Sequence, residues 1–384
     1  MRNRPVATIG FVLMAVSFLL VLAWPWLSDL RSLRRSNPTD VAPLPLRGNA
    51  ADVAPVLILR GHTDQVKVVA FSPDGTTLAS ASLDATVRLW RVADGTLLRA
   101  LQGHTANVRS AVFAPDGATL ASASDDRTVR LWRVADGTLL HTLTAHAALV
   151  DSIAFSPDGS VLASGSWDNT VRLWRVADGG LLYTLTGHGS RVRDVAFSPD
   201  ATTLASSSLD YSVRLWRVAD GALLRTLAGH TDGVQVVAFS PDGTTLASAS
   251  DNTVRLWRVA DGTLVHTLSG HAGFVSNVAF SPDGITLASS SWERSVRLWR
   301  VADGALLHTL SGHTDWVFDV VFSPDGATLA SASLDKTARL WSVVNGSLLR
   351  TFWTDVVHDV AFSPDGTTLA SSSLDYSVRL WAVP

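Results

Sequence analysis

The chain contains no cysteine, which excludes disulfides, thiolate metal sites and a cysteine nucleophile. Charged residues make up only 17% of its 384 residues, and the net charge of −3 supplies no basic field that would attract nucleic acid. Hydrophobic residues, at 47%, are abundant enough to build a large core. This composition favours a folded domain and gives no support to nucleic-acid binding.

The first 55 residues differ from the rest of the chain. Residues 6–27 carry no charge, and a helix of that length would measure about 33 Å, enough to cross the ~30 Å hydrocarbon core of a bilayer. We therefore predict an N-terminal transmembrane helix within residues 1–29, a proline-rich linker over 30–55, and a single-pass, membrane-anchored protein whose domain, 56–384, lies on the outer side. A cleaved signal peptide is the alternative for the first segment.

From residue 56 onward the sequence repeats with a period of 40–42 residues. Such a period, with several strands in each unit, is typical of a β-propeller. The tripeptide Arg-Leu-Trp marks each unit and ends at Trp90, Trp132, Trp174, Trp216, Trp257, Trp299, Trp341 and Trp381.

Each repeat predicts four short strands. In one copy the apolar or alternating segments 223–227, 234–240, 246–250 and 253–259 are too short for competing helices. Turn sequences such as Asp261-Gly262 bound them and favour tight hairpins. A sheet of four such strands is marginal alone, so each sheet must stack on neighbouring sheets.

The two ends of the repeat array predict a closed ring. Residues 56–60 supply one lone outer strand, and residues 357–383 supply three strands, so together they complete an eighth sheet. The predicted fold is all-β: a closed eight-bladed β-propeller of four-stranded antiparallel blades, preceded by one N-terminal transmembrane helix.

Six repeats contain a Gly-His pair that is followed by an aspartate and then by the signature tryptophan, the first pair at 61–62. With these motifs the chain resembles the WD-repeat (tryptophan–aspartate repeat) β-propeller family over residues 56–384. One departure is that arginine, serine or alanine, and not aspartate, follows the signature tryptophan.

The resemblance implies that a histidine, a serine, an aspartate and the tryptophan of each repeat form a structural hydrogen-bond relay. A catalytic Ser-His-Asp triad is the alternative, but the set recurs in repeat after repeat, whereas an enzyme needs one site. We expect no catalytic residue, no metal site and no cofactor. The relay members, in blade order, are His62, Ser80, Asp84 and Trp90; His104, Ser122, Asp126 and Trp132; His146, Ser164, Asp168 and Trp174; His188, Ser206, Asp210 and Trp216; His230, Ser248, Asp251 and Trp257; His271, Ser289, Glu293 and Trp299; His313, Ser331, Asp335 and Trp341; and, without a histidine, Ser371, Asp375 and Trp381.

The two faces of the predicted disc differ in sequence variation. The Pro-Asp-Gly and Ala-Asp-Gly turns share one face, here called the turn face, and are nearly the same in all repeats. On the opposite, variable face, three positions differ from repeat to repeat: the first precedes the valine that opens the inner strand, the second follows it, and the third precedes the relay acid. These positions supply an aromatic sector (Phe274, Trp292, Trp316 and Phe318), a basic sector (Lys67, Arg109, Arg191 and Arg193), and Trp167.

Aromatic and arginine side chains are the residues that interface hot spots favour. We therefore predict a non-enzymatic interaction scaffold at a membrane that binds a protein or peptide partner through the variable face. An enzyme or small-ligand binder that uses the central channel is the alternative, with scattered acids such as Asp194, Asp319 and Asp359 on the inner strands. Binding of nucleic acid or anionic lipid by the basic sector would rest on only four cations.

Overall fold

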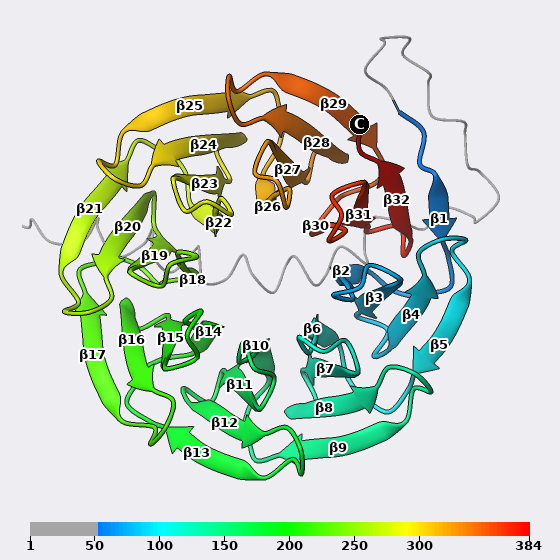
Figure 1. Cartoon of the computed structure of the whole chain (residues 1–384), viewed down its shortest axis with the longest axis horizontal. Coiled ribbons are helices and arrows are strands. Elements are labelled where there is room, and N and C mark those ends of the chain that lie inside the picture. Colours follow the sequence, from blue (N-terminus) through cyan, green and yellow to red (C-terminus); the bar gives the residue numbers. More distant parts are fainter. Residues whose placement is uncertain (1–52) are drawn as a thin grey trace, which may run out of the picture. The chain divides into compact units, whose positions relative to one another are not determined.

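The computed structural model describes residues 53–384 as a ring of eight four-stranded antiparallel sheets (Figure 1). The predicted eight-bladed propeller is confirmed. Within each sheet the strands follow one another from the central channel to the outer wall, so that the first blade has the order β2-β3-β4-β5. Each blade thus adds one strand of each type to the ring.

The innermost strands line the central channel. In the first blade the apolar residues at the first and fourth positions, Val66 and Val69, are buried against the neighbouring blades. In six of these strands a β-bulge follows the first valine, as between Val66 and Val68. The innermost strands are β2 (Val66–Phe71), β6 (Val108–Phe113), β10 (Val150–Phe155), β14 (Val192–Phe197), β18 (Val236–Phe239), β22 (Val275–Phe280), β26 (Val317–Phe322) and β30 (Val360–Phe362).

The second strands are buried along almost their whole length. Their alanines and serines are small, which lets adjacent blades approach closely on both faces of the sheet. These strands are β3 (Thr77–Ser82), β7 (Thr119–Ser124), β11 (Val161–Ser166), β15 (Thr203–Ser208), β19 (Thr245–Ser250), β23 (Thr286–Ser291), β27 (Thr328–Ser333) and β31 (Thr368–Ser372).

The third strands carry the Arg-Leu-Trp signature, whose leucine and tryptophan are buried in the first blade as Leu89 and Trp90. Burying each large indole supplies much of the apolar area between blades. These strands are β4 (Val87–Arg91), β8 (Thr128–Arg133), β12 (Val171–Arg175), β16 (Ser212–Arg217), β20 (Thr253–Arg258), β24 (Ser295–Arg300), β28 (Thr337–Ser342) and β32 (Val378–Ala382).

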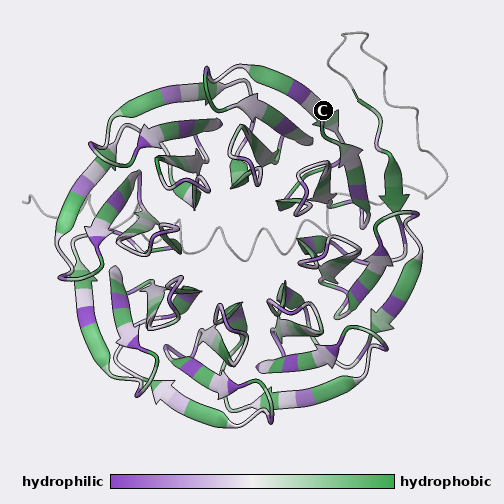
Figure 2. Ribbon diagram, viewed as in Figure 1, coloured by the Kyte–Doolittle hydropathy of each residue, from purple (hydrophilic) through white to green (hydrophobic). Residues whose placement is uncertain are grey.

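The fourth strands form the outer wall, where apolar and polar residues are mixed (Figure 2), and most of their residues are exposed or half-buried, as expected for a strand that faces water. The fourth strands are β5 (Leu97–Leu101), β9 (Leu139–Thr144), β13 (Leu181–Leu185), β17 (Leu223–Ala228), β21 (Leu264–Ser269), β25 (Leu306–Ser311), β29 (Leu348–Trp353) and, completing the eighth blade, β1 (Leu57–Leu59).

The ring closes by pairing the two ends of the domain. Strand β1 is antiparallel to β32, with Leu57 opposite Leu380. The Val56 amide donates to the Leu380 carbonyl at 2.8 Å. The predicted closure is therefore confirmed, and no blade is left with an uncovered face.

The core lies between the blades. One cluster joins Leu89 and Leu101 of the first blade to Val108, Leu120 and Trp132 of the second, and each of the other blade junctions has an equivalent cluster. Since each blade buries both of its faces in this way, its stability depends on its neighbours.

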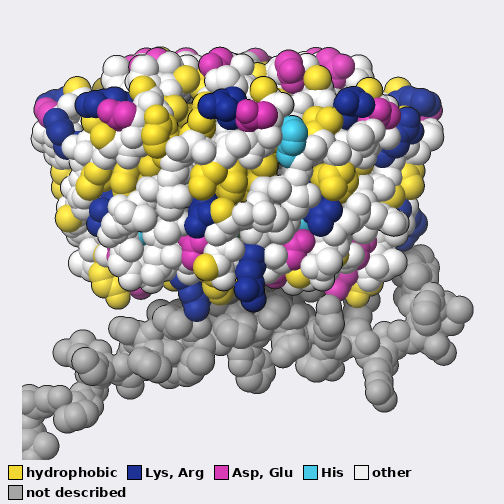
Figure 3. All heavy atoms as spheres, turned by 90° about the horizontal axis from the view of Figure 1, so that it is seen from below, with side chains coloured by type: hydrophobic (Ala, Val, Ile, Leu, Met, Phe, Trp, Pro, Cys, Tyr) yellow, Lys and Arg dark blue, Asp and Glu magenta, His cyan; other side chains and the backbone are white. Residues whose placement is uncertain are grey.

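Ordered turns make up the turn face. In the first blade the Asp74 carboxylate accepts a hydrogen bond from the Ser72 hydroxyl at 2.6 Å, and Arg91 forms an exposed ion pair with Asp94 at 3.0 Å. Equivalent arginine–aspartate ion pairs occur in five further blades. Figure 3 shows cationic and anionic side chains alternating along one edge of the propeller. The repeated turns explain why this face varies so little.

The predicted transmembrane helix, over residues 6–27, lies outside the described residues, as do residues 1–29 and most of the predicted linker, 30–55. The predicted domain boundaries therefore stay predictions. Within residues 53–384, no helix is long and apolar enough to cross a membrane.

Candidate partner-binding face

The relay residues of the first blade lie within hydrogen-bonding distance of one another. The Trp90 indole donates to the Ser80 hydroxyl oxygen at 2.8 Å, and that oxygen lies 2.8 Å from Nε2 of His62. Nδ1 of His62 lies 2.8 Å from the Asp84 carboxylate. If serine donates to Nε2, Nδ1 carries the proton that it donates to Asp84, and every polar group has a partner.

The relay fixes the protonation of its acid. Burial alone would raise the pKa of Asp84, but hydrogen bonds from His62 and Thr86 outweigh it and hold this pKa well below its usual range. The same contacts occur in the second, third, fourth and seventh blades, and in the sixth with Glu293 in place of aspartate. The Ser80 side chain is fully buried, so its hydroxyl has no access to a substrate. The arrangement is that of a structural network.

The fifth blade departs from this pattern. His230 keeps its contact with Ser248 at 2.7 Å, but its Nδ1 has no hydrogen-bond partner among the described residues. Asp251 instead accepts hydrogen bonds from Thr231 and Thr253. The repeat is one residue shorter here, and Asp251 itself adopts the left-handed conformation, with φ of 44°. Burial, together with the Arg255 charge, lowers the pKa of His230 to about 4.

The eighth blade replaces the missing histidine with an arginine. The guanidinium of Arg379 donates to the Thr354 hydroxyl and, at 2.6 Å, to the Asp375 carboxylate. The Trp381 indole still donates to Ser371, at 2.9 Å. The sequence pattern gave no sign that Arg379 takes the place of the relay histidine, because an arginine stands at this position of the Arg-Leu-Trp tripeptide in every blade.

On the variable face, the first and third variable positions lie side by side. Backbone hydrogen bonds join them within a blade, as from the Trp292 amide to the Phe274 carbonyl at 3.0 Å and from Leu334 to Trp316 at 2.8 Å. The fifth blade lacks its third position, since Ser250 is the last residue of β19. These two positions therefore form the rim around the channel mouth.

Three aromatic residues meet on this rim and are here called the aromatic cluster: Phe274, Trp292 and Trp316. The rings of Trp292 and Trp316 are stacked, with centroids 4.4 Å apart and planes inclined by 7°. Phe274 packs against Trp292 with centroids 4.9 Å apart. All three side chains are half-buried. The cluster thus joins the sixth and seventh blades in one apolar surface.

Trp167 forms a second rim contact, with the predicted basic sector. The Arg191 guanidinium lies 4.0 Å from the centroid of the Trp167 ring, and that of Arg109 lies 5.6 Å away. The Trp167 indole donates to Asp151 at 3.1 Å. Arg191 is the one exposed residue of these four.

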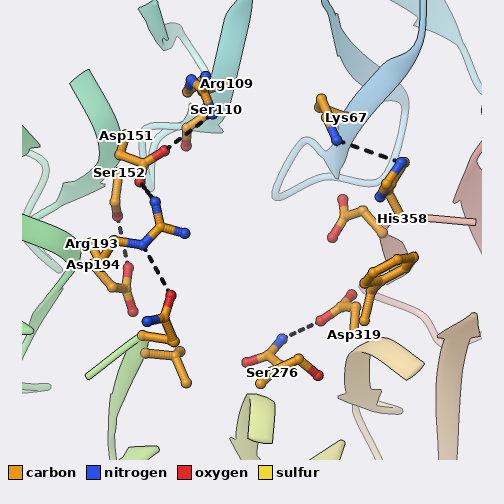
Figure 4. Close-up of a pocket in the computed structure, with 15 residues that line it drawn as sticks. Lys67, Arg109, Ser110, Asp151, Ser152, Arg193, Asp194, Ser276, Asp319 and His358 are labelled. Atoms are coloured by element: carbon orange, nitrogen blue, oxygen red, sulfur yellow. Dashed lines mark hydrogen bonds and ion pairs between the residues drawn. The ribbon is translucent and has the colours of Figure 1, made fainter. Parts of the chain in front are cut away.

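The second variable position does not lie on the rim. In six blades it is the bulged residue of the inner strand, and in all eight blades it lines a channel cavity of about 340 Å³ (Figure 4). The predicted aromatic and basic sectors are therefore not single surfaces. Part of each lies in the channel and not on the rim, namely Lys67, Arg109, Arg193 and Phe318. The residues at this position, here called the channel ring, are Lys67, Arg109, Asp151, Arg193, Gln235, Ser276, Phe318 and His358.

Two of the channel arginines are neutralised by carboxylates. Arg109 forms an ion pair with Asp125 and lies 3.8 Å from Asp151. Arg193 pairs with Asp151 and donates to Gln235 at 3.1 Å. These contacts leave the predicted basic sector with less free positive charge than its sequence implied.

Three channel acids bind the backbone of the next blade. Asp359 accepts from the Val69 amide at 2.7 Å, Asp319 from Val360 at 3.1 Å, and Asp194 from Val237 at 3.1 Å. Burial raises the pKa of each acid, and the neighbouring Asp319 charge raises that of Asp359 further. These carboxyls stabilise the blade junctions, and sequence reasoning had placed them in the channel only as scattered polar residues.

No group of three or more potential metal ligands occurs within residues 53–384. Each relay histidine other than His230 faces one acid and one serine, and His230 faces a serine alone, which is not a metal-binding arrangement.

Curated proteins match this chain only over short segments of its repeat array. The chain is 36% identical over 59 residues to ribosome biogenesis protein ERB1 of Debaryomyces hansenii, covering 15% of this chain and 6% of that protein. It is 40% identical over 63 residues to ribosome biogenesis protein BOP1 of Rattus norvegicus, covering 16% and 8%. The chain therefore spans less than a tenth of the length of these relatives.

A solved structure matches the whole domain. The computationally designed protein Ika8 superposes with a TM-score of 0.78 at 27% sequence identity, over 86% of this chain and 99% of the designed chain.

The predicted localisation, a single-pass membrane protein with its propeller outside, is contradicted. The curated relatives with matching segments are named as ribosome biogenesis proteins, not as membrane proteins. That prediction was based mainly on the uncharged segment 6–27.

The profile of the WD40 family (WD domain, G-beta repeat) matches eight consecutive segments of the chain: 54–91, 95–133, 137–175, 179–217, 221–258, 262–300, 304–342 and 346–382. Because these segments cover nearly the whole propeller, the chain belongs to the WD40 repeat family.

Proposed function

We propose that this propeller is a non-catalytic scaffold that binds a protein or peptide partner through the aromatic cluster on its variable face. Propellers of the WD40 family are generally interaction scaffolds and not enzymes. The observation that carries the proposal is the contiguous packing of Phe274, Trp292 and Trp316, contributed by two adjacent blades.

Variation among duplicated repeats would by itself scatter aromatic residues over both faces. Here two of the three aromatic residues occupy the same position in neighbouring blades, and the third lies between them. Half-buried tryptophans offer large apolar area at a small cost in side-chain entropy, which is why they are frequent anchors of interfaces. The turn face, by contrast, repeats polar turns and exposed ion pairs.

The curated relatives do not identify the partner, because each match covers only one or two repeats. The acids in the channel offer little support for an enzyme, since Asp194, Asp319 and Asp359 accept hydrogen bonds from the backbone. We therefore assign binding of the protein or peptide partner to the rim.

Affinity capture with quantitative mass spectrometry tests the proposal. Trp292→Ala and Trp316→Ala should lose the same captured proteins, by tenfold or more, because each substitution removes half of the stack. Trp353→Ala is the matched control: its side chain is 45% exposed on the outer strand β29, away from the rim. If both rim variants, shown to be folded by circular dichroism, captured the same proteins as the parent chain, the aromatic cluster would not be the binding surface.

A further inference from the structure

Lys67 is a half-buried cation that faces the channel cavity (Figure 4). It occupies the bulge of β2, which directs its side chain toward the channel. Its Nζ lies 3.5 Å from Nε2 of His358. Within residues 53–384 no carboxylate forms an ion pair with Lys67, whereas Arg109 pairs with Asp125 and Asp151, and Arg193 pairs with Asp151. An ammonium removed from water is normally paired with an anionic group. The described residues supply no such ion pair to Lys67.

Lys67 carries a positive charge at neutral pH. Burial, and after it the charge of Arg109, lowers the pKa of Lys67 to about 8, so the side chain is mostly protonated at neutral pH. Asp151 and Asp64 act in the opposite sense, but Asp151 is already paired with Arg193.

His358 is positioned as a neutral partner. Burial, and after it the Lys67 charge, holds the pKa of His358 well below its usual range. Its ring packs against Phe318 with centroids 5.0 Å apart, which fixes its orientation. A neutral imidazole accepts one hydrogen bond from the ammonium and leaves the other two N–H groups for a ligand.

We propose that the channel mouth beside Lys67, Arg109 and His358 binds the oxyanion of a small carboxylate or phosphate ligand. The cavity, at about 340 Å³, has the size of a small-molecule site, and its wall is mainly polar. The ligand oxygens accept hydrogen bonds from Lys67, while Arg109, which is already paired with Asp125, lines the same cavity. The oxyanion supplies the counter-charge that the described chain does not.

This site is separate from the proposed partner surface. Lys67 belongs to the first blade and His358 to the eighth, whereas the aromatic cluster belongs to the sixth and seventh blades. A failure of either proposal leaves the other untouched, because Trp316→Ala removes no group from the oxyanion site.

Isothermal titration of the full chain with malonate and, separately, with inorganic phosphate, at constant ionic strength set by sodium chloride, tests the proposal. We expect saturable binding of at least one probe. Binding of malonate alone identifies a carboxylate site, and binding of phosphate alone identifies a phosphate site. Absence of saturable binding of both probes would overturn the proposal.

Substitutions locate the bound anion. Lys67→Met should weaken binding at least tenfold, since it keeps the length of the side chain but removes its charge, while Lys67→Arg should weaken it less. Arg91→Gln, on the turn face, is the matched control and should leave binding unchanged. Equal affinity in the parent chain and in Lys67→Met would show that the anion binds elsewhere, and thermal unfolding of each variant confirms that it is folded.

Discussion

At the scale of single residues, Lys67 shows how a buried charge opposes folding in a pH-dependent way. The pKa of its ammonium is 10.5 in the unfolded chain and about 8 in the propeller. Between these values the unfolded chain binds more protons, so the free energy of unfolding rises with pH. Below pH 8 both states are protonated, and the full cost of burying the charge is present.

Lys67→Met should therefore stabilise the propeller at pH 7, by about 1–3 kcal/mol, because it removes this cost. The gain should shrink as the pH approaches 10, where the folded parent chain holds a neutral amine. Thermal unfolding of both proteins at pH 7 and pH 10, without added multivalent anions, measures the difference. A lower melting temperature for Lys67→Met at pH 7 would show that Lys67 makes a favourable contact.

The relay residues could be predicted from the sequence because the resemblance and their recurrence pointed to the same set. The location of the side chains at the second variable position could not be predicted from the sequence. Whether Lys67 and Phe318 lie on the rim or in the channel depends on a one-residue bulge, and the sequence of these strands contains no glycine or proline that would mark it.

At the scale of one blade, a single missing residue accounts for the departure of the fifth blade. In the first blade, Leu83 and Asp84 follow Ser82, but Asp251 directly follows Ser250. The shorter turn forces Asp251 into the left-handed conformation and moves its carboxylate away from His230. The sequence placed His230 and Asp251 in one relay because spacing alone cannot show the direction of a side chain.

Insertion of a leucine between Ser250 and Asp251 should restore the fifth relay. His230 would regain a hydrogen-bond acceptor for its Nδ1 atom. The pKa of His230 should then rise above about 4, and the free energy of unfolding should rise by about 1–3 kcal/mol. Urea unfolding and an NMR titration of His230 measure the two effects. The same insertion between Ser82 and Leu83, where the turn is already complete, should destabilise the chain. Equal losses from the two insertions would contradict the assignment.

At the scale of the whole molecule, the count of repeats and the unequal ends of the array were enough to predict eight blades and their closure. The pairing of Leu57 with Leu380 fulfils that expectation. Closure of the ring also forms the proposed oxyanion site. It places Nζ of Lys67 3.5 Å from Nε2 of His358, although these residues are 291 positions apart in the sequence. The stacking of Trp292 on Trp316 likewise requires two blades side by side, which no single repeat could reveal.

Hydrogen–deuterium exchange of the propeller, alone and with a partner recovered by affinity capture, tests the central claim most directly. Binding through the aromatic cluster predicts slower exchange in segments 272–276, 290–294 and 314–318, with no change at the turn-face segments 115–118 and 325–328. Protection confined to the turn face, or to the outer strands, would contradict the account.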